Sequence, residues 1–292
     1  MRELEAKFFN DLCKAVEELL DGKEAERKFM LSGGIDSILL LTAYDKVFGA
    51  KDLKTYTMIG TNLKEIGYSR LYGQQYFKTD HTEIKVTLDD FLDRLNLIQN
   101  MGFTTVFQTM FYILMWISIE KADLAGATII HGGGADPLQG SSNVFMYTAT
   151  NQIAESRNVS VDEARDIIKK ENYQKRIAFE VNSSAWLRSY AYKKVNGTEI
   201  APYYSDHVSW LAYEPFSVTQ PKSKRFFKSV MKYVGVKGVD KIQRVGLQLG
   251  TGLYYLLRKE LEQAHGMDAN KVIKKLSKKD EKCKCREPNQ IV

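Results

Sequence analysis

Cysteine is scarce in this chain, and long hydrophobic runs are missing. The 292 residues include three cysteines, Cys13, Cys283 and Cys285, and five prolines. Three cysteines cannot build the disulfide framework of a small secreted domain, so we expect a reducing, cytoplasmic environment. No apolar run reaches the ~18 residues that a membrane-spanning helix needs, and the first residues lack the apolar centre of a signal peptide. We therefore expect no membrane partner.

A third absence concerns nucleotide chemistry. The chain contains no Gly-x-x-x-x-Gly-Lys-Ser/Thr sequence, which excludes an NTPase of the kind that cleaves the γ-phosphate from such a loop. Cys283-Lys284-Cys285 offers two thiols where a structural zinc site needs four ligands, so we expect no zinc. The composition, 44% hydrophobic and 27% charged, is that of an ordinary globular protein.

The chain does contain a short apolar stretch that leads into a glycine-rich turn and a helix. Residues 29–31 predict a buried parallel strand, and residues 38–47 predict a helix that stops at Gly49. Glycine amides, serine hydroxyls and the positive end of a helix all suit an oxyanion such as phosphate. A carboxylate beside phosphate needs a divalent cation between them, so we predict a Mg²⁺ ligand at Asp36. The intervening turn reads Ser32-Gly33-Gly34-Ile35-Asp36-Ser37.

Strands and helices alternate through the first half of the chain. This alternation predicts a doubly wound parallel α/β sheet with right-handed crossovers, in which ligands bind at the carboxyl ends of the strands. A second glycine-rich segment, residues 132–140, directly follows a predicted strand, so we expect the two segments to converge. The predicted strands cover residues 29–31, 55–59, 81–87 and 127–130, and the helices cover residues 2–21, 65–77, 89–98 and 108–122, the last of them buried.

Both glycine-rich segments resemble signatures of one enzyme family. Ser-Gly-Gly-Ile-Asp-Ser resembles the pyrophosphate loop of the ATP pyrophosphatases, which cleave ATP between the α and β phosphates. The segment Gly-Gly-Gly-Ala-Asp-Pro-Leu-Gln-Gly resembles the second signature of asparagine synthetases, Gly-Glu-Gly-Ala-Asp-Glu-Leu-Phe-Gly-Gly, and the version found in β-lactam synthetases. Asp36 and Asp136 lie about a hundred residues apart, as in that family. The resemblance covers roughly residues 1–250.

Weaker matches follow in the second half. Residues 197–206 are similar to the family's Gly-x-Glu-x-Arg-x-Pro-Phe-Leu-Asp, although the arginine is not kept, and residues 223–228 look like its Lys-x-x-Leu-Arg helix. The change of pattern in the second half and the lysines at the end predict three parts: an ATP-binding α/β domain over residues 1–150, a mainly helical substrate-side region over 151–270, and a flexible basic tail over 271–292. Helices are predicted over residues 160–170, 173–192, 203–211, 224–234 and 253–264.

The resemblance also implies a reaction that uses ATP and Mg²⁺. A carboxylate attacks the α-phosphorus, giving an acyl-adenylate and pyrophosphate, and ammonia or an amine then attacks the activated carbonyl. Asp36 and Asp136 would hold Mg²⁺, and Lys224 would stabilise negative charge on the phosphates. Pyrophosphate would be bound by Ser32, Gly33, Gly34 and Ser37, and adenosine by main-chain atoms near Leu31, Met58 and Gly132.

The chain departs from the family at the residue that helps to deprotonate the amine. Asparagine synthetases place a glutamate there and β-lactam synthetases a tyrosine, whereas this chain has Gly133. Three alternatives follow from this departure. Another group acts as the base, the nucleophile differs from that of the family, or the second step is lost. The candidate bases are Glu199, Tyr203, Tyr204 and Asp206. No glutaminase domain precedes the loop, so we expect ammonia from solution or from a separate glutaminase, or an amine of the substrate.

Three further residues and the tail have simpler interpretations. We expect His81 to be a hydrogen-bonded structural residue, Cys13 a packed thiol, and His131 either structural or a substrate contact. The lysines of residues 271–292 predict a solvated end, or a contact with nucleic acid or an acidic partner. Beside an AMP-forming ligase acting on small molecules, two alternatives remain: a pyrophosphatase that modifies a nucleobase in nucleic acid, and a non-catalytic nucleotide-binding relative.

Overall fold

A five-stranded sheet of parallel strands forms the centre of the protein. The computed structural model describes residues 2–23, 25–60, 66–139, 152–168, 186–219, 224–242 and 252–278. The strand order is β3-β2-β1-β4-β5, and every neighbouring pair is parallel. The strands are β1 (Arg27–Met30), β2 (Lys54–Ile59), β3 (Asp80–Lys85), β4 (Thr128–His131) and β5 (Thr198–Ile200).

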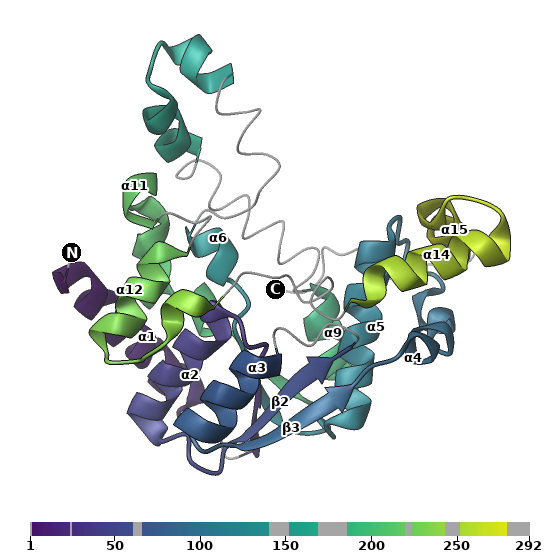
Figure 1. The fold of residues 1–292 in the computed structure, drawn as a ribbon, viewed down its shortest axis with the longest axis horizontal. Coiled ribbons are helices and arrows are strands. Elements are labelled where there is room, and N and C mark those ends of the chain that lie inside the picture. Colours follow the sequence, from purple (N-terminus) through teal and green to yellow (C-terminus); the bar gives the residue numbers. More distant parts are fainter. Residues whose placement is uncertain are drawn as a thin grey trace.

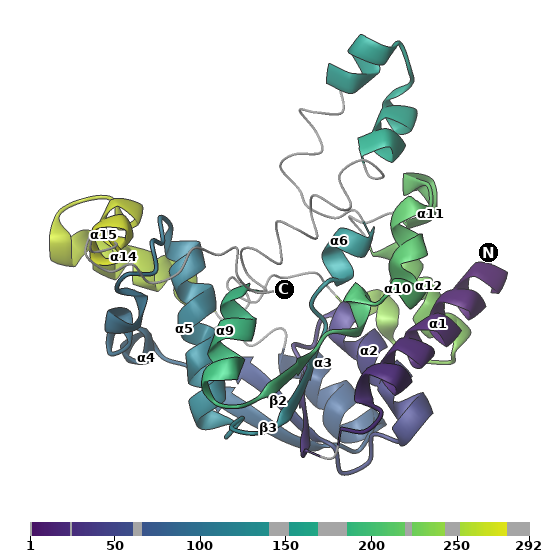
Figure 2. The same ribbon diagram turned by 180° about the vertical axis from the view of Figure 1, so that it is seen from behind.

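Helices cover both faces of this sheet, as Figures 1 and 2 show from opposite sides. Side chains alternate along a strand, so Phe29 and Ile130 enter one core while Tyr56 and Ile129 enter the other. The predicted doubly wound α/β fold is therefore confirmed. The first core contains side chains of α1 (Arg2–Leu20), α2 (Ile35–Phe48) and α12 (Arg225–Tyr233), and the second those of α5 (Val106–Lys121), α9 (Trp186–Lys194), α14 (Leu253–His265) and α15 (Ala269–Leu276).

The strand order creates a switch point between β1 and β4. The chain runs from β1 outward through β2 to β3 and then returns to place β4 against the other side of β1. Connections therefore leave the carboxyl ends of β1 and β4 in opposite directions, which opens a crevice at that edge of the sheet. The segments that follow these two strands, residues 31–37 and 132–136, meet there.

Two predicted helices are confirmed as buried elements. The apolar stripe of α1 includes Phe8, Leu12 and Val16, all fully buried, and Cys13 packs beside it. Burial raises the pKa of the Cys13 thiol to about 11, in keeping with a packed, unreactive side chain. Helix α5 is apolar on all sides because it lies inside the second core.

The helix predicted over residues 89–98 begins within one residue of the expected position but ends early, and its N-cap is Thr87. Thr87 caps it: the Thr87 hydroxyl accepts from the amide of Asp90, and the Asp90 carboxylate accepts from the amide of Thr87 at 2.8 Å. Helix α4 (Leu88–Leu92) then ends early, because the amide of Arg94 bonds to the Phe91 carbonyl three residues back, a tighter spacing than that of an α-helix. A 3-10 segment, η2 (Leu95–Ile98), completes the stretch.

The second half contributes a strand that its helical pattern did not predict. Strand β5 pairs with β4, and Gly197 packs closely beside this pairing: a β-carbon there would lie 2.9 Å from the Ile129 Cδ1 atom, the tip of a flexible side chain. The single helix expected over residues 203–211 is also wrong. Ser205 is extended and its hydroxyl accepts from the amide of His207. This cap divides the stretch into η4 (Pro202–Tyr204), α10 (Asp206–Ser209) and η5 (Trp210–Tyr213).

Other expected helices are confirmed where the structure describes them. Residues 66–76 form α3 (Ile66–Ser69) and a wider π-helical segment, η1 (Arg70–Tyr76). The reciprocal hydrogen bonds of Ser160 and Glu163 open the helix over residues 161–168. The predicted helix over 173–192 lies partly outside the described residues, and α9 forms its end. A helix over residues 152–157 and the short helices α6 (Ala135–Gln139), α11 (Phe216–Thr219) and η6 (Val239–Lys241) complete the helices and strands of the described residues.

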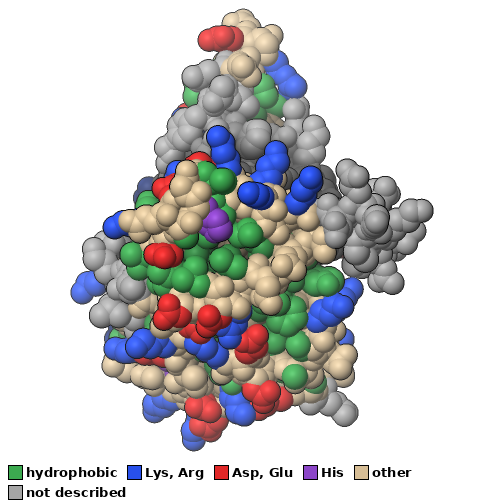
Figure 3. Space-filling model, turned by 90° about the vertical axis from the view of Figure 1, so that its right-hand side faces the viewer, with side chains coloured by type: hydrophobic (Ala, Val, Ile, Leu, Met, Phe, Trp, Pro, Cys, Tyr) green, Lys and Arg blue, Asp and Glu red, His purple; other side chains and the backbone are tan. Residues whose placement is uncertain are grey.

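The expected start of a flexible tail at residue 271 falls inside α15. Val272 and Ile273 are buried in the second core, whereas Lys271, Lys274 and Lys275 are exposed. Figure 3 views the side of the molecule that carries α14 and α15, and lysine and arginine side chains gather on its upper part. Residues 279–292 lie outside the described residues. Within the described part of the chain, no helix combines the length and apolar character that crossing a membrane requires.

The packing of α15 predicts that substitutions at two neighbouring positions change the free energy of unfolding by different amounts. Ile273→Ala should lower the free energy of unfolding by about 2–5 kcal/mol, because it leaves a cavity in the second core. Lys274→Ala, on the exposed face of the same helix, should change it by less than about 0.5 kcal/mol. Urea unfolding followed by circular dichroism measures both. Equal effects would show that α15 does not pack as described.

Candidate active site

The turn after β1 has the backbone that an oxyanion-binding loop requires. Gly33 has φ +76°, a conformation that favours glycine, and Gly34 is the N-cap of α2. Gly34 offers no side chain to cap the first-turn amides of α2, and its own amide donates to the Ser32 hydroxyl at 3.3 Å. The Ser37 hydroxyl lies 3.0 Å from that of Ser32 and donates to the Gly34 carbonyl. The loop therefore gathers amide and hydroxyl donors at the positive end of a helix.

Three charged groups meet beside this loop. Asp36 lies in the first turn of α2 and Asp136 in the first turn of α6, and the Lys224 ammonium contacts both carboxylates. Its distance to the Asp136 Oδ1 atom is 3.0 Å. The two acids, a hundred positions apart, therefore share one cation, and the predicted convergence of the two glycine-rich segments is found in the structure.

Lys224 is held in a strained and buried setting. Its backbone is left-handed, with φ 50°, at the N-cap of α12, and only 6% of its side chain is exposed. Burial by itself would lower the pKa of the ammonium, but the charges and hydrogen bonds of Asp36 and Asp136 outweigh it and raise that pKa. Lys224 is therefore a permanent positive charge in the crevice. Strain of this kind, of order 1–3 kcal/mol, tends to occur at functional sites.

Two contacts fix the backbone of the loop around Asp36. The buried Tyr203 hydroxyl donates to the Asp36 carbonyl at 2.9 Å, and its ring stacks on Phe227 of α12. On the other side, a β-carbon at Gly132 would lie 3.4 Å from the Ser37 main-chain nitrogen. Gly132 thus lets the second segment approach the first closely. Tyr203 was a candidate base, but burial raises its pKa and its hydroxyl is engaged in a structural hydrogen bond.

The atoms predicted to hold adenosine lie along the same edge. The Leu31 amide donates to the Tyr56 carbonyl at 2.8 Å, and the Leu31 carbonyl accepts from the Thr57 hydroxyl. Both main-chain groups of Leu31 are therefore already bonded to β2, and a nucleotide would have only the second lone pair of the carbonyl. Met58 is half-buried on β2 and Gly132 half-buried after β4. Their role toward adenosine remains a prediction.

A second pair of polar side chains stands at the ends of β4 and β5. The His131 Nε2 atom lies 2.7 Å from the Glu199 Oε1 atom, and the Gly133 amide donates to His131 Nδ1 at 3.0 Å. The Ser189 hydroxyl of α9 donates to the other Glu199 oxygen. The sequence suggested His131 and Glu199 separately and did not suggest Ser189. A polar residue at the end of an apolar strand was the available signal for His131.

The remaining candidates are accounted for structurally. A β-carbon at Gly134 would lie 3.0 Å from ring carbons of Tyr204, so this ring packs against the glycine-rich segment. Asp206 is exposed at the start of α10. His81 Nδ1 lies 2.8 Å from the Thr55 hydroxyl, and burial lowers the His81 pKa. The structural interpretation of His81 is confirmed.

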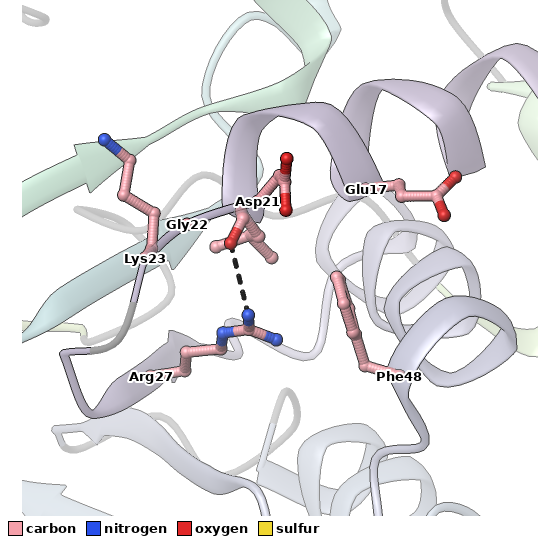
Figure 4. Close-up of a pocket in the computed structure, with 7 residues that line it drawn as sticks. Glu17, Asp21, Gly22, Lys23, Arg27 and Phe48 are labelled. Carbon is pink, nitrogen blue, oxygen red and sulfur yellow. Dashed lines mark hydrogen bonds between the residues drawn. The ribbon is translucent and has the colours of Figure 1, made fainter.

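A separate cavity lies at the opposite end of β1 and takes no part in this site. Figure 4 shows it between the end of α1, the start of β1 and the end of α2. Glu17, Asp21, Lys23, Arg27 and Phe48 line it, and the Arg27 guanidinium lies 4.3 Å above the Phe48 ring. The Arg27 side chain also donates to the Leu20 carbonyl, so its guanidinium is already engaged with the ring and with this main-chain oxygen.

The donor set at Asp36 and Asp136 fits a magnesium ion that is shared with phosphate. No group of three or more acidic, histidine or cysteine side chains that could bind a metal occurs among the described residues. Two carboxylates that already converge on a cation supply oxygen ligands, and Mg²⁺ usually completes its shell with phosphate oxygens and water. The arrangement thus fits magnesium that arrives with a nucleotide.

Comparison with known proteins agrees with this geometry. The sequence model of one protein family, described as asparagine synthase, matches residues 10–267. No curated protein sequence matches the chain. The likeness to β-lactam synthetases stays a prediction. The family match covers most of the chain and contains both glycine-rich segments, Glu199 and Lys224, so the protein belongs to the asparagine synthase family of ATP-dependent ligases.

Proposed function

We propose that the protein is an AMP-forming ligase that adenylates a small carboxylic acid and then joins it to ammonia or an amine. The observation that carries this proposal is the contact of one buried ammonium, Lys224, with Asp36 and Asp136 at the carboxyl ends of β1 and β4. A parallel sheet places its ligands at such a switch point. The oxyanion loop, the acid pair and the buried cation are the parts that cleavage next to a pyrophosphate group needs.

The first step transfers adenylate to the substrate acid. A carboxylate oxygen attacks the α-phosphorus, the bond between that phosphorus and the bridging oxygen breaks, and pyrophosphate leaves with the electron pair. Because the leaving group carries several negative charges, stabilising them is the main task of the site. The amides of Gly33 and Gly34 and the hydroxyls of Ser32 and Ser37 would bind the pyrophosphate, and Lys224 would offset its charge.

Asp36 and Asp136 are the residues that would hold Mg²⁺. When bound, Mg²⁺ neutralises charge on the phosphate oxygens. Lys224, which contacts both carboxylates, would share them with the metal and would offset part of the negative charge of the phosphates. Free ammonia, a separate glutaminase or an amine substrate can supply the nitrogen. The proposed reaction therefore does not require glutaminase activity from this domain.

Pyrophosphate exchange tests the first step directly. With a panel of small carboxylic acids, the protein should move label from radioactive pyrophosphate into ATP only when Mg²⁺ and an accepted acid are present. Asp36→Asn should abolish the exchange, because it removes a charged metal ligand. A folded Asp36→Asn variant that exchanges as fast as the wild type, or the formation of ADP without AMP, would contradict the proposal.

Substitution of Lys224 should affect pyrophosphate exchange, whereas substitution of an exposed lysine on the same helix should not. Lys224→Met should lower the exchange rate by about 100-fold or more, the usual cost of losing one group that stabilises developing negative charge. Lys232→Met, which removes an exposed lysine of α12, should leave the rate unchanged. Circular dichroism would show whether both variants fold. Similar rates for the two folded variants would place Lys224 outside the chemistry.

The lysines of residues 271–292 keep a nucleic-acid substrate as an alternative. Because α15 is packed in the second core, only the part of this segment after α15 can be removed to test it. Removing residues 271–292 would destroy a packed helix, so the truncation should remove residues 279–292. If the acceptor is a small molecule, this truncation should leave exchange and amide formation unchanged. Loss of amide formation, together with weaker and less salt-dependent RNA binding, would favour the nucleic-acid acceptor.

A further inference from the structure

We infer that Glu199, oriented by His131, accepts the proton from the attacking amine in place of the missing side chain at residue 133. This inference rests on the proposed ligase function and concerns only its second step. Gly133 has no side chain, so the group that the family places there is absent. His131 lies two residues before that position, and Glu199, which pairs with Ile129 on the neighbouring strand β5, reaches the His131 ring with its carboxylate.

The pair is tied to the adenylation site from both sides. Next to His131, Gly132 approaches the Ser37 main chain, and four residues after Glu199, the Tyr203 hydroxyl donates to the Asp36 carbonyl. Both strands that carry the pair are therefore anchored on the loop that would hold the pyrophosphate. An acyl-adenylate formed beside Asp36 would present its carbonyl to the crevice edge where β4 and β5 end.

The hydrogen bonds around His131 assign the roles within the pair. The Gly133 amide donates to Nδ1, so that nitrogen is an acceptor and the ring proton of the neutral imidazole lies on Nε2. Nε2–H then donates to Glu199 Oε1, while the Ser189 hydroxyl donates to Oε2. The carboxylate is left as the basic group, and His131 is a positioning residue. Only 16% of the Glu199 side chain is exposed, so few waters compete for its oxygens.

The other candidate bases lack this arrangement. The Tyr203 hydroxyl is buried and bonded to the loop carbonyl, and the Tyr204 ring packs on Gly134. Asp206 is exposed at the start of α10, where its charge suits the positive end of that helix. Glu199 is the one acid among the four candidates that is both shielded from water and held by two donors.

The chemical step balances without any further reactant. The amine nitrogen forms a bond to the carbonyl carbon of the acyl-adenylate, and one N–H proton passes to the Glu199 carboxylate. The bond between the carbonyl carbon and the phosphate oxygen breaks, and AMP leaves with the electron pair. A positioned general base of this kind typically accelerates such a step by 10²–10⁴-fold.

The test separates the two steps in one variant. Glu199→Gln keeps the size of the side chain and removes its basicity, so amide formation with ammonia or an amine should fall by about 10²–10⁴-fold. Pyrophosphate exchange and trapping of the acyl-adenylate with hydroxylamine, a nucleophile that is neutral at pH 7, should stay close to the wild-type rates. Asp206→Asn serves as the matched control and should keep all three activities.

The positioning role of His131 is tested by comparing a substitution that keeps an N–H donor with one that removes it. His131→Gln retains an N–H that can reach Glu199 and should keep more amide formation than His131→Leu, with exchange equal in the two. Glu199→Gln forming amide at the wild-type rate would overturn the inference, and so would a folded Glu199→Gln variant that loses exchange as well. Absence of exchange in the wild-type protein would instead contradict the ligase function itself.

Discussion

One ammonium group holds together the part of the molecule on which the chemistry depends. Asp36 on α2 and Asp136 on α6 bring two negative charges to the same crevice, and without a cation between them they would repel each other. Lys224 at the start of α12 supplies that cation from within the chain. The first two elements follow neighbouring strands and the third comes from the helical second half, so the contact joins the sheet to the helices that cover it.

The same contact gives the site its electrostatic character. Lys224 is almost fully buried, and the carboxylates raise its pKa above the ordinary value although burial acts in the opposite direction. Water and salt screen a charge in that setting only weakly. Its attraction to a phosphate is therefore stronger than that of an exposed lysine. The charge balance of the crevice therefore depends on one arrangement of three groups.

Local patterns predicted most of the fold, and tertiary contacts explain the exceptions. The first four strands, the buried helix α5 and the meeting of Asp36 with Asp136 followed from apolar periodicity and from glycines at strand ends. The strand at Thr198–Ile200 did not, because three residues are too few to show an alternating pattern and only pairing with β4 defines them. The pairing of His131 with Glu199 was hidden for the same reason, since it depends on that strand.

The position of β5 also determines when the site becomes complete during synthesis. Ile200 pairs with Ile130, and Lys224 reaches Asp36 across most of the chain, so neither contact can form until the later segments have left the ribosome. A nascent chain that ends after α6 would hold both acids, yet it would lack the cation that lies between them. The contact of Lys224 with Asp36 and Asp136 can therefore form only once the chain has been translated as far as the start of α12.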